Sequence, residues 1–138
     1  MIQKQSRLNI SDNSGAREIL CIRIIPGIKK IGTAGDLIVS VVKKALPSET
    51  ISESMSQKAN SLNTKTPIKK SEIVLAMIIR IKTFLSRDDG IFVAFDKNSA
   101  ILLKSDKMPR ASRIFGPVSK EVKKKNLIKI NSLANQFI

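Results

Sequence analysis

Residues 73–81 read IVLAMIIRI, which is the strongest strand signal in the chain. Its Ile and Val residues are β-branched, and such residues favour extended strands. Because consecutive positions are apolar, both faces of the stretch must be covered, which indicates a fully buried strand. Working outward, we expect strands of the same kind in five further runs, at residues 7–11, 17–25, 37–46, 91–95 and 100–103.

Turn-forming residues separate the first of these runs. Residues 12–15 (Asp-Asn-Ser-Gly) suit a turn because Asn and Gly tolerate positive φ, while Asp and Ser bond the local backbone. Pro26 and Gly27 end the second run, since Pro has no N–H to donate to a strand ladder. Residues 32–36 are expected to form the next turn.

The spacing of the runs indicates a mainly β fold. They are short, evenly spaced and too close together for helical crossovers, which leaves a barrel or a sandwich. A closed barrel is favoured, because the runs are apolar on both faces and the chain is too small for two large sheets. We expect residues 91–95 and 100–103 to form a hairpin around residues 96–99.

The segment 47–67 differs from its surroundings. It is rich in Ser, Asn and Thr, has few large apolar residues and lacks a clear period. We interpret it as a long exposed loop or insertion within a single domain spanning residues 1–138. The alternative is a disordered linker between two domains, which is disfavoured because neither half alone has enough strands to close a core.

The end of the chain is predicted to be helical. Pro117 stands where a helix can begin, because the missing N–H of Pro costs nothing in the first turn. Residues 119–125 follow and end in three lysines, at the helix end where the dipole favours cations. A second helical stripe is then formed by Leu127, Ile128, Ile130 and Leu133.

The charge of the chain points to a polyanionic partner. Its 138 residues include 25 Lys and Arg against 11 Asp and Glu, a formal charge of +14. This excess repels itself unless nucleic acid or an anionic membrane surface neutralises it. With five Phe and no Trp or Tyr, the chain offers few stacking platforms for single-stranded bases. Phosphate contacts to a structured RNA are therefore expected to supply the affinity.

Basic residues at strand ends and in loops form the candidate RNA-binding set. A single lysine is as often a plain solvated surface charge as an RNA contact. The set as a whole is more informative, because acidic residues are not interleaved to balance it. Together with two turn residues, the set comprises Lys4, Arg7, Asn13, Ser14, Arg17, Arg23, Lys29, Lys30, Lys43, Lys44, Lys69, Lys70, Arg80, Lys82 and Arg87.

An enzyme is disfavoured by the residues that the chain offers. It has no His, the commonest acid–base residue. Cys21 is the single cysteine and lies mid-strand, so we interpret it as a buried structural thiol. Asp88 and Asp89 precede Gly90 and suit a turn better than a metal site. Residues 32–35 lack the Lys and Ser/Thr with which a phosphate loop ends. From these observations together, we expect no metal and no cofactor.

A membrane role is also disfavoured. The chain has no run of 18 apolar residues, and residues 119–125 are too short for a basic helix that binds a membrane surface.

The residue usage bears on the compartment, because the frequent Lys, Ile and Asn correspond to A/T-rich codons. This codon usage favours a protein of an organelle ribosome, in a mitochondrion rather than a plastid. The alternative location is a bacterial cytoplasm.

Three stretches of the chain match a known family. The first comprises residues 1–3, 8–9, 12–17 (DNSGAR) and 21–22. The second comprises residues 76–79 (AMII), 89–90, Phe95, Asn98 and 101–102, with Ile101 where Val is usual. The third comprises residues 113–118 (RIFGPV), 129–130 and 132–134. In nearly everything outside 48–67, the chain resembles the universal large-subunit ribosomal protein L-fourteen family, of the bacterial and organellar type.

This resemblance implies a small closed five-stranded β-barrel with a protruding hairpin and short C-terminal helices. It implies a structural constituent of the large ribosomal subunit in translation. The implied partners are large-subunit ribosomal RNA, neighbouring large-subunit ribosomal proteins and, across the interface, small-subunit ribosomal RNA. The surface that the family turns towards the small subunit, where a ribosome-silencing factor can dock, corresponds to Ser112, Arg113, Lys129 and Ser132.

The chain departs from the family pattern in four places. The basic hairpin tip is thinned to residues 82–87 (KTFLSR), Ser71 and Glu72 replace a usual Gly-Asp turn, and the loop 28–32 is shortened. The insertion 48–67 has no counterpart in the typical bacterial form and suits a ribosome with altered neighbours. The rival interpretation is a free-standing nucleic-acid-binding barrel, which the few aromatic residues disfavour.

Overall fold

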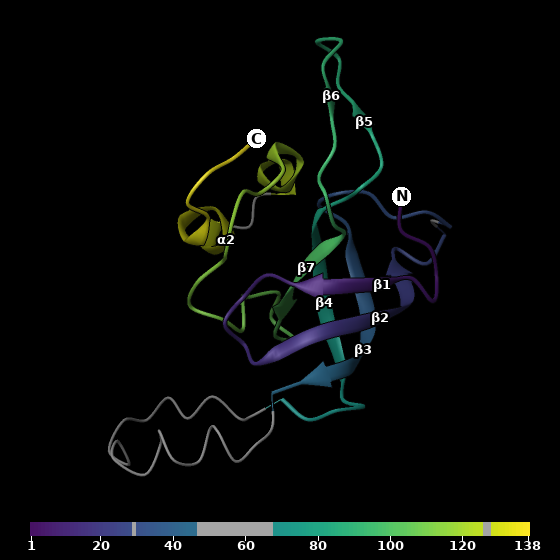
Figure 1. Cartoon of the computed structure of the whole chain (residues 1–138), viewed down its shortest axis with the longest axis vertical. Helices are drawn as coiled ribbons and strands as arrows, with labels where there is room; N and C mark the ends of the chain where they lie inside the picture. Colours follow the sequence, from purple (N-terminus) through teal and green to yellow (C-terminus); the bar gives the residue numbers. More distant parts are fainter. Residues whose placement is uncertain (29, 47–67, 126–127) are drawn as a thin grey trace.

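The computed structural model describes residues 1–28, 30–46, 68–125 and 128–138, and it contains one closed five-stranded barrel (Figure 1). The barrel strands are β1 (Arg7–Ile10), β2 (Ala16–Ile25), β3 (Leu37–Ala45), β4 (Ile73–Arg80) and β7 (Ser99–Leu103). Neighbours in the order β1-β2-β3-β4-β7 are antiparallel, and a parallel pairing of β1 with β7 closes the ring. The barrel predicted from the sequence is therefore confirmed.

The first four predicted strands agree with β1 to β4 to within one residue at each end. Pro26 follows the last residue of β2, as expected. Cys21 is fully buried in β2, which confirms its predicted burial, and the loss of solvent raises the pKa of its thiol. The predicted insertion 48–67 lies outside the described residues.

Two apolar clusters explain why β4 and β7 are apolar on both faces. Ile78 and Leu102 belong to the cluster that fills the barrel, whereas Met77 and Ile101 belong to a second cluster on the other face of the same strands. All five residues of β7 are buried. The second cluster is completed by side chains from the C-terminal region, among them Ile114, Val118, Val122 and Ile130.

The predicted hairpin of residues 91–95 and 100–103 is wrong. β6 (Phe92–Val93) pairs with β5 (Leu85–Ser86) in a separate two-stranded sheet, whereas β7 pairs with β4 and β1. The β5–β6 hairpin projects away from the barrel (Figure 1), as the resemblance implies. Gly90 N donates to Arg87 O over 3.0 Å at its tip. Residues 82–87 are thus an arm of the hairpin and not its tip.

The C-terminal region forms the 3-10 helix η1 (Lys120–Lys125) and the α-helix α2 (Ile128–Leu133). The helix predicted over residues 119–125 is confirmed to within one residue by η1, but Pro117 does not lie in its first turn. Val118 N donates to Gln136 O, and Ile138 N donates to Val118 O, each over 2.9 Å. These bonds keep the chain extended beyond Pro117, so the first helix begins only at Lys120. The reason is a pairing with the C-terminal tail, which no local pattern could reveal.

Candidate nucleic-acid interface

Basic side chains gather at the end of the barrel where β3 leads towards β4. The lysine pairs 43–44 and 69–70 flank this connection and are exposed. Ser71 N donates to Val42 O over 2.8 Å, which brings the two pairs together. Arg17 is exposed at the start of β2, next to the pairing of Ala16 with Ala45 of β3. We call Arg17, Lys43, Lys44, Lys69 and Lys70 the β3–β4 cation group.

One carboxylate holds two cations across three strands of the barrel wall. Glu18 on β2 accepts from Arg7 Nη1 on β1 at 3.0 Å and from Lys44 Nζ on β3 at 2.9 Å. Hydrogen bonds from Lys44 and then Arg7 hold the pKa of Glu18 below its ordinary value. Because one carboxylate faces two cations, the trio keeps a net positive charge and its cationic heads are fixed in place.

A second set of basic side chains lies where the N-terminal segment meets the base of the hairpin. Ile2 N donates to Gly32 O over 2.9 Å, and the N-terminal ammonium of Met1 contacts Thr83 Oγ1. These contacts join three segments that are distant in the sequence. We call the exposed residues Lys4, Arg23, Lys30 and Lys82 the N-terminal cation group. Lys29 lies outside the described residues.

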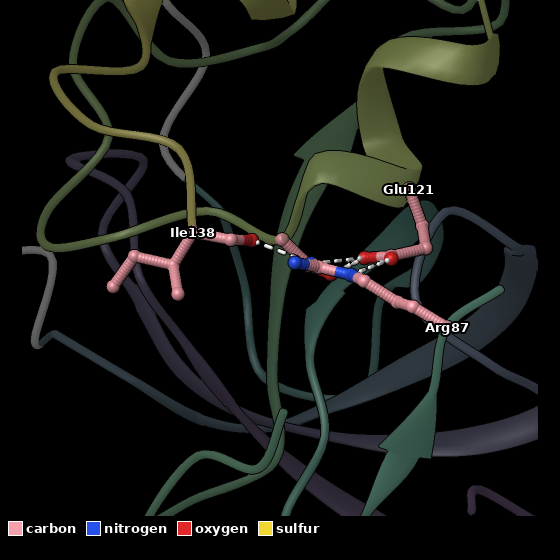
Figure 2. Close-up of polar contacts among 4 residues, drawn as sticks. Arg87, Glu121 and Ile138 are labelled. Carbon is pink, nitrogen blue, oxygen red and sulfur yellow. Dashed lines mark hydrogen bonds and ion pairs between the residues drawn. The ribbon is translucent and has the colours of Figure 1, made fainter. Parts of the chain in front are cut away.

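Two arginines of the candidate set are engaged by the protein itself. The half-buried Arg80 donates to the Phe115 carbonyl, and burial lowers the pKa of its guanidinium. Arg87 donates to both carboxylate oxygens of Glu121, at 2.8 and 3.3 Å, and to the main-chain oxygen of Ile138 at 2.9 Å (Figure 2). Arg80 therefore joins β4 to the segment before η1, and Arg87 joins the hairpin to the C-terminal region.

The turn between β1 and β2 meets the segment before η1. Asn13 Oδ1 accepts from the N–H groups of Ser112 (3.1 Å) and Arg113 (3.3 Å), and Asn13 Nδ2 donates to Ser112 Oγ at 3.1 Å. Asp12 stabilises the same turn and joins it to β7, because its carboxylate accepts from Ser14 N and Leu102 N, each at 2.8 Å. The sequence assigned Asn13 to RNA and Ser112 to a protein contact, but the structure places them together.

Arg113 and Lys129 are anchored through the same apolar cluster. Each is exposed, and each precedes an isoleucine of the cluster on β4 and β7, namely Ile114 and Ile130. Ser132 lies one turn along α2 and donates to the carbonyl of Lys129 over 2.9 Å. The predicted contact residues thus belong to two segments that are packed against one cluster.

Sequence reasoning missed a cavity of about 420 Å³ beside β1, β4 and β7. Phe95 gives it an aromatic ring and Lys97 gives it an exposed cation, which are groups that contact bases and phosphates, whereas Arg80 at its wall is held by the Phe115 carbonyl. The sequence pattern places Lys97 in a turn between two strands, and because β6 pairs with β5 instead, Lys97 lies at this cavity. The cavity is lined by Asn9, Ser11, Arg80, Phe95, Asp96, Lys97, Ser99 and Pro117.

Among the residues that the structure describes, no helix has the length and apolar character needed to cross a bilayer. Over the same residues, no group of three or more His, Cys, Asp and Glu is arranged to hold a metal ion.

A family model described as ribosomal protein L14p/L23e matches residues 1–138, which is all of this sequence.

Proposed function

The chain belongs to the ribosomal protein L14p/L23e family, and from this premise we propose that it attaches to the large subunit by binding ribosomal RNA electrostatically. Membership makes it a structural component of the large ribosomal subunit in a family that is not enzymatic. The surplus of positive charge is displayed on a rigid barrel, so the positions of the cations are fixed before RNA is met.

The observation that carries the proposal is the exposure of the two cation groups. Apart from Lys44 with Glu18, their members form no ion pair with an acid among the described residues. Exposed cations that the protein does not neutralise suit phosphate oxygens. Arg80 and Arg87 have internal partners, so their proposed role is to orient the structures that carry other contacts.

We further propose that Ser112, Arg113, Lys129 and Ser132 face the small subunit and its ribosomal RNA. Arg113 and Lys129 are exposed while their neighbours are buried, which suits a contact surface on a rigid support. The same surface is the proposed docking place for a ribosome-silencing factor, which would block subunit joining by occupying it.

For the compartment, we propose an organellar ribosome, mitochondrial before plastid, with a bacterial one as the alternative. The abundance of Lys, Ile and Asn supports it, and so does the segment 48–67, which the typical bacterial form lacks. In this proposal the segment contacts neighbours that bacterial ribosomes do not have, within a single domain spanning residues 1–138.

Co-sedimentation tests the RNA attachment. A tagged copy of the chain should travel with large subunits after a wash in moderate salt, and it should be released by high salt. A free-standing nucleic-acid-binding module would stay at the top of the gradient, and that result would contradict the proposal.

Replacement of Arg113 by Glu tests the subunit interface. We expect Arg113→Glu to impair joining of the small and large subunits while the thermal unfolding midpoint stays close to that of the unchanged protein. An equal loss of joining and of stability would assign Arg113 to the fold instead.

A further inference from the structure

The cavity of about 420 Å³ lies at the seam where the barrel closes, and its volume falls in the range of about 300–1,000 Å³ that is typical of ligand pockets. The end of β1 lies beside the start of β7 (Figure 1), and the paired residues Asn9 and Ser99 both line the cavity. Asn9 N donates to Asn98 O over 3.0 Å, and Ser11 N donates to Ala100 O over 3.1 Å. Main-chain bonds between the two strands therefore fix this wall of the cavity.

Segments outside the barrel complete the cavity, and hydrogen bonds hold them in place as well. Phe95 N donates to Ile81 O over 3.0 Å, which fixes the segment between β6 and β7 against the end of β4. Phe115 N donates to Ser11 O over 2.8 Å, and Arg80 donates to the Phe115 carbonyl. Because its walls are held by the protein itself, the cavity is formed before a ligand arrives, and less order has to be gained on binding.

The side chains at the cavity match the parts of a nucleotide. Phe95 is half-buried and offers a ring on which one base can stack, and the exposed Lys97 offers an ammonium for a phosphate. The amide of Asn9 and the carboxylate of Asp96 are exposed hydrogen-bonding groups that suit the polar edge of a base. A single ring is enough for a single base, so the low aromatic content of the chain is no obstacle.

The charges at the cavity suit one phosphate. Two cations, Arg80 and Lys97, line it against one acid, Asp96, which gives a formal charge of +1. Lys82 lies next to it, because Lys82 N donates to Asn98 Oδ1 over 2.8 Å. None of these three cations forms an ion pair with an acid among the described residues. A nucleotide within an RNA chain carries one negative charge, which this surplus can neutralise, whereas a free triphosphate carries several.

We propose that this cavity binds one unstacked nucleotide of the large-subunit ribosomal RNA, with its base on Phe95 and its phosphate on Lys97. Unstacked nucleotides of loops and bulges are the parts of RNA that proteins read by aromatic stacking and by hydrogen bonds to base edges. The inference rests on the proposed function, because the RNA is that of the same subunit. It adds a concave site for a base to the exposed cations that bind phosphates.

Chemical probing of assembled subunits tests the inference. Large subunits that contain the tagged unchanged chain, Phe95→Leu or Lys97→Gln are treated with dimethyl sulfate and with a carbodiimide, which together report on all four bases. We expect one nucleotide to become about fivefold or more reactive in Phe95→Leu, because a lost stacking contact releases the base. The same nucleotide should respond to Lys97→Gln. The matched controls are Phe92→Leu and Lys104→Gln, at exposed residues outside the cavity, and they should leave this nucleotide unchanged.

The outcomes separate the inference from the function on which it rests. If no nucleotide responds to the two cavity variants, or if the controls produce the same response, the inference is overturned and electrostatic attachment stays intact. Failure of the unchanged tagged chain to enter large subunits contradicts the proposed function itself.

Two further measurements address the fold and a free nucleotide as the ligand. Lys97 is exposed, so Lys97→Gln should leave the thermal unfolding midpoint unchanged, and it alone carries the test if Phe95→Leu prevents folding. The purified full chain is also dialysed to equilibrium against AMP, GMP, CMP and UMP. If one of them bound to the unchanged chain and not to Lys97→Gln, while no ribosomal RNA base responded, the site would take a free nucleotide and the proposed RNA ligand would be refuted.

Discussion

Asn13 is the residue that ties the β1–β2 turn to the segment carrying Arg113. Its amide makes three hydrogen bonds to Ser112 and Arg113. We predict that Asn13→Ala lowers the free energy of unfolding by about 1–2 kcal/mol, because the partners lose bonds that water only partly replaces. Urea denaturation measures this change.

Its neighbour Ser14 is the matched control. Ser14 Oγ is buried without a hydrogen-bond partner among the described groups, so its removal abandons no bond. Ser14→Ala should leave the unfolding free energy unchanged or raise it slightly. If the two variants had equal effects, the amide of Asn13 would not be the link.

Ser71 occupies a backbone conformation that side chains disfavour. Its φ is +69°, in the left-handed region where glycine has no steric penalty. At this turn, where Ser71 and Glu72 replace the usual Gly-Asp, the serine therefore adopts a positive φ. We predict that Ser71→Gly stabilises the protein by about 0.5–1 kcal/mol in urea denaturation. Ser86→Gly, in the extended β5, should instead destabilise it, and stabilisation by both would count against strain at residue 71.

At the scale of elements, the hairpin and the C-terminal region are joined by an ion pair whose strength depends on pH. Burial raises the pKa of Glu121, but hydrogen bonds from Arg87 and Ser119 and the charge of Arg87 together outweigh it, so the pKa lies below its ordinary value of 4.5. A carboxylate with a lowered pKa stabilises the folded state above pH 4.5, and the stabilisation is lost as the pH falls through the folded pKa.

We therefore predict that Glu121→Gln lowers the unfolding free energy by about 1 kcal/mol at pH 7, since the pair is only partly shielded from solvent. The difference from the unchanged protein should shrink as the pH falls below 4.5 and through the lowered pKa that Glu121 has in the folded protein. Urea denaturation from pH 3 to pH 7 measures it, with the exposed Asp88→Asn as control. A difference that stays constant with pH would refute the ion-pair account.

The C-terminal helices pack against the apolar cluster on β4 and β7. Two adjacent residues of α2, one buried and one exposed, allow this packing to be tested. Ile130 is fully buried against β4 and β7, whereas Lys129 is exposed. We predict that Ile130→Ala costs about 2–4 kcal/mol of stability because it leaves a cavity. Lys129→Ala should cost less than about 0.5 kcal/mol. In a subunit-joining assay, Lys129→Ala should nevertheless show the defect, and the reverse pattern would exchange the two roles.

The barrel strands could be predicted from the sequence because their runs are apolar and bounded by turn residues. The β5–β6 hairpin could not be predicted, because β6 has only two residues. No local signal shows that its partner is β5 and not the following strand β7. The extended path after Pro117 was missed for a similar reason, since it depends on bonds to Gln136 and Ile138.

The candidate site was predictable in its chemistry but not in its pairings. Charge and residue type identified the cations of both groups. That Glu18 holds Arg7 and Lys44, or that Glu121 holds Arg87, follows only from the folded arrangement, because the partners come from different strands or from distant segments.

At the scale of the whole molecule, the net charge of +14 sets the salt dependence of RNA binding. If the two cation groups neutralise about 6–10 phosphates, affinity for large-subunit ribosomal RNA should fall by about 10³–10⁵ between 50 and 200 mM salt. Filter binding across this range measures the slope. Lys43→Gln combined with Lys70→Gln should make the slope shallower by about 1–2, and a slope near zero would contradict electrostatic attachment.

The parallel pairing of β1 with β7 also governs when the protein can fold during its synthesis. Asn9 emerges from the ribosome early, but its partner Ser99 follows only after most of the chain has been made. Until then the edge of β1 and the apolar side of β4 stay open, so a growing chain needs shielding from aggregation. A building block of ribosomes thus becomes competent for assembly only when its own translation is nearly finished.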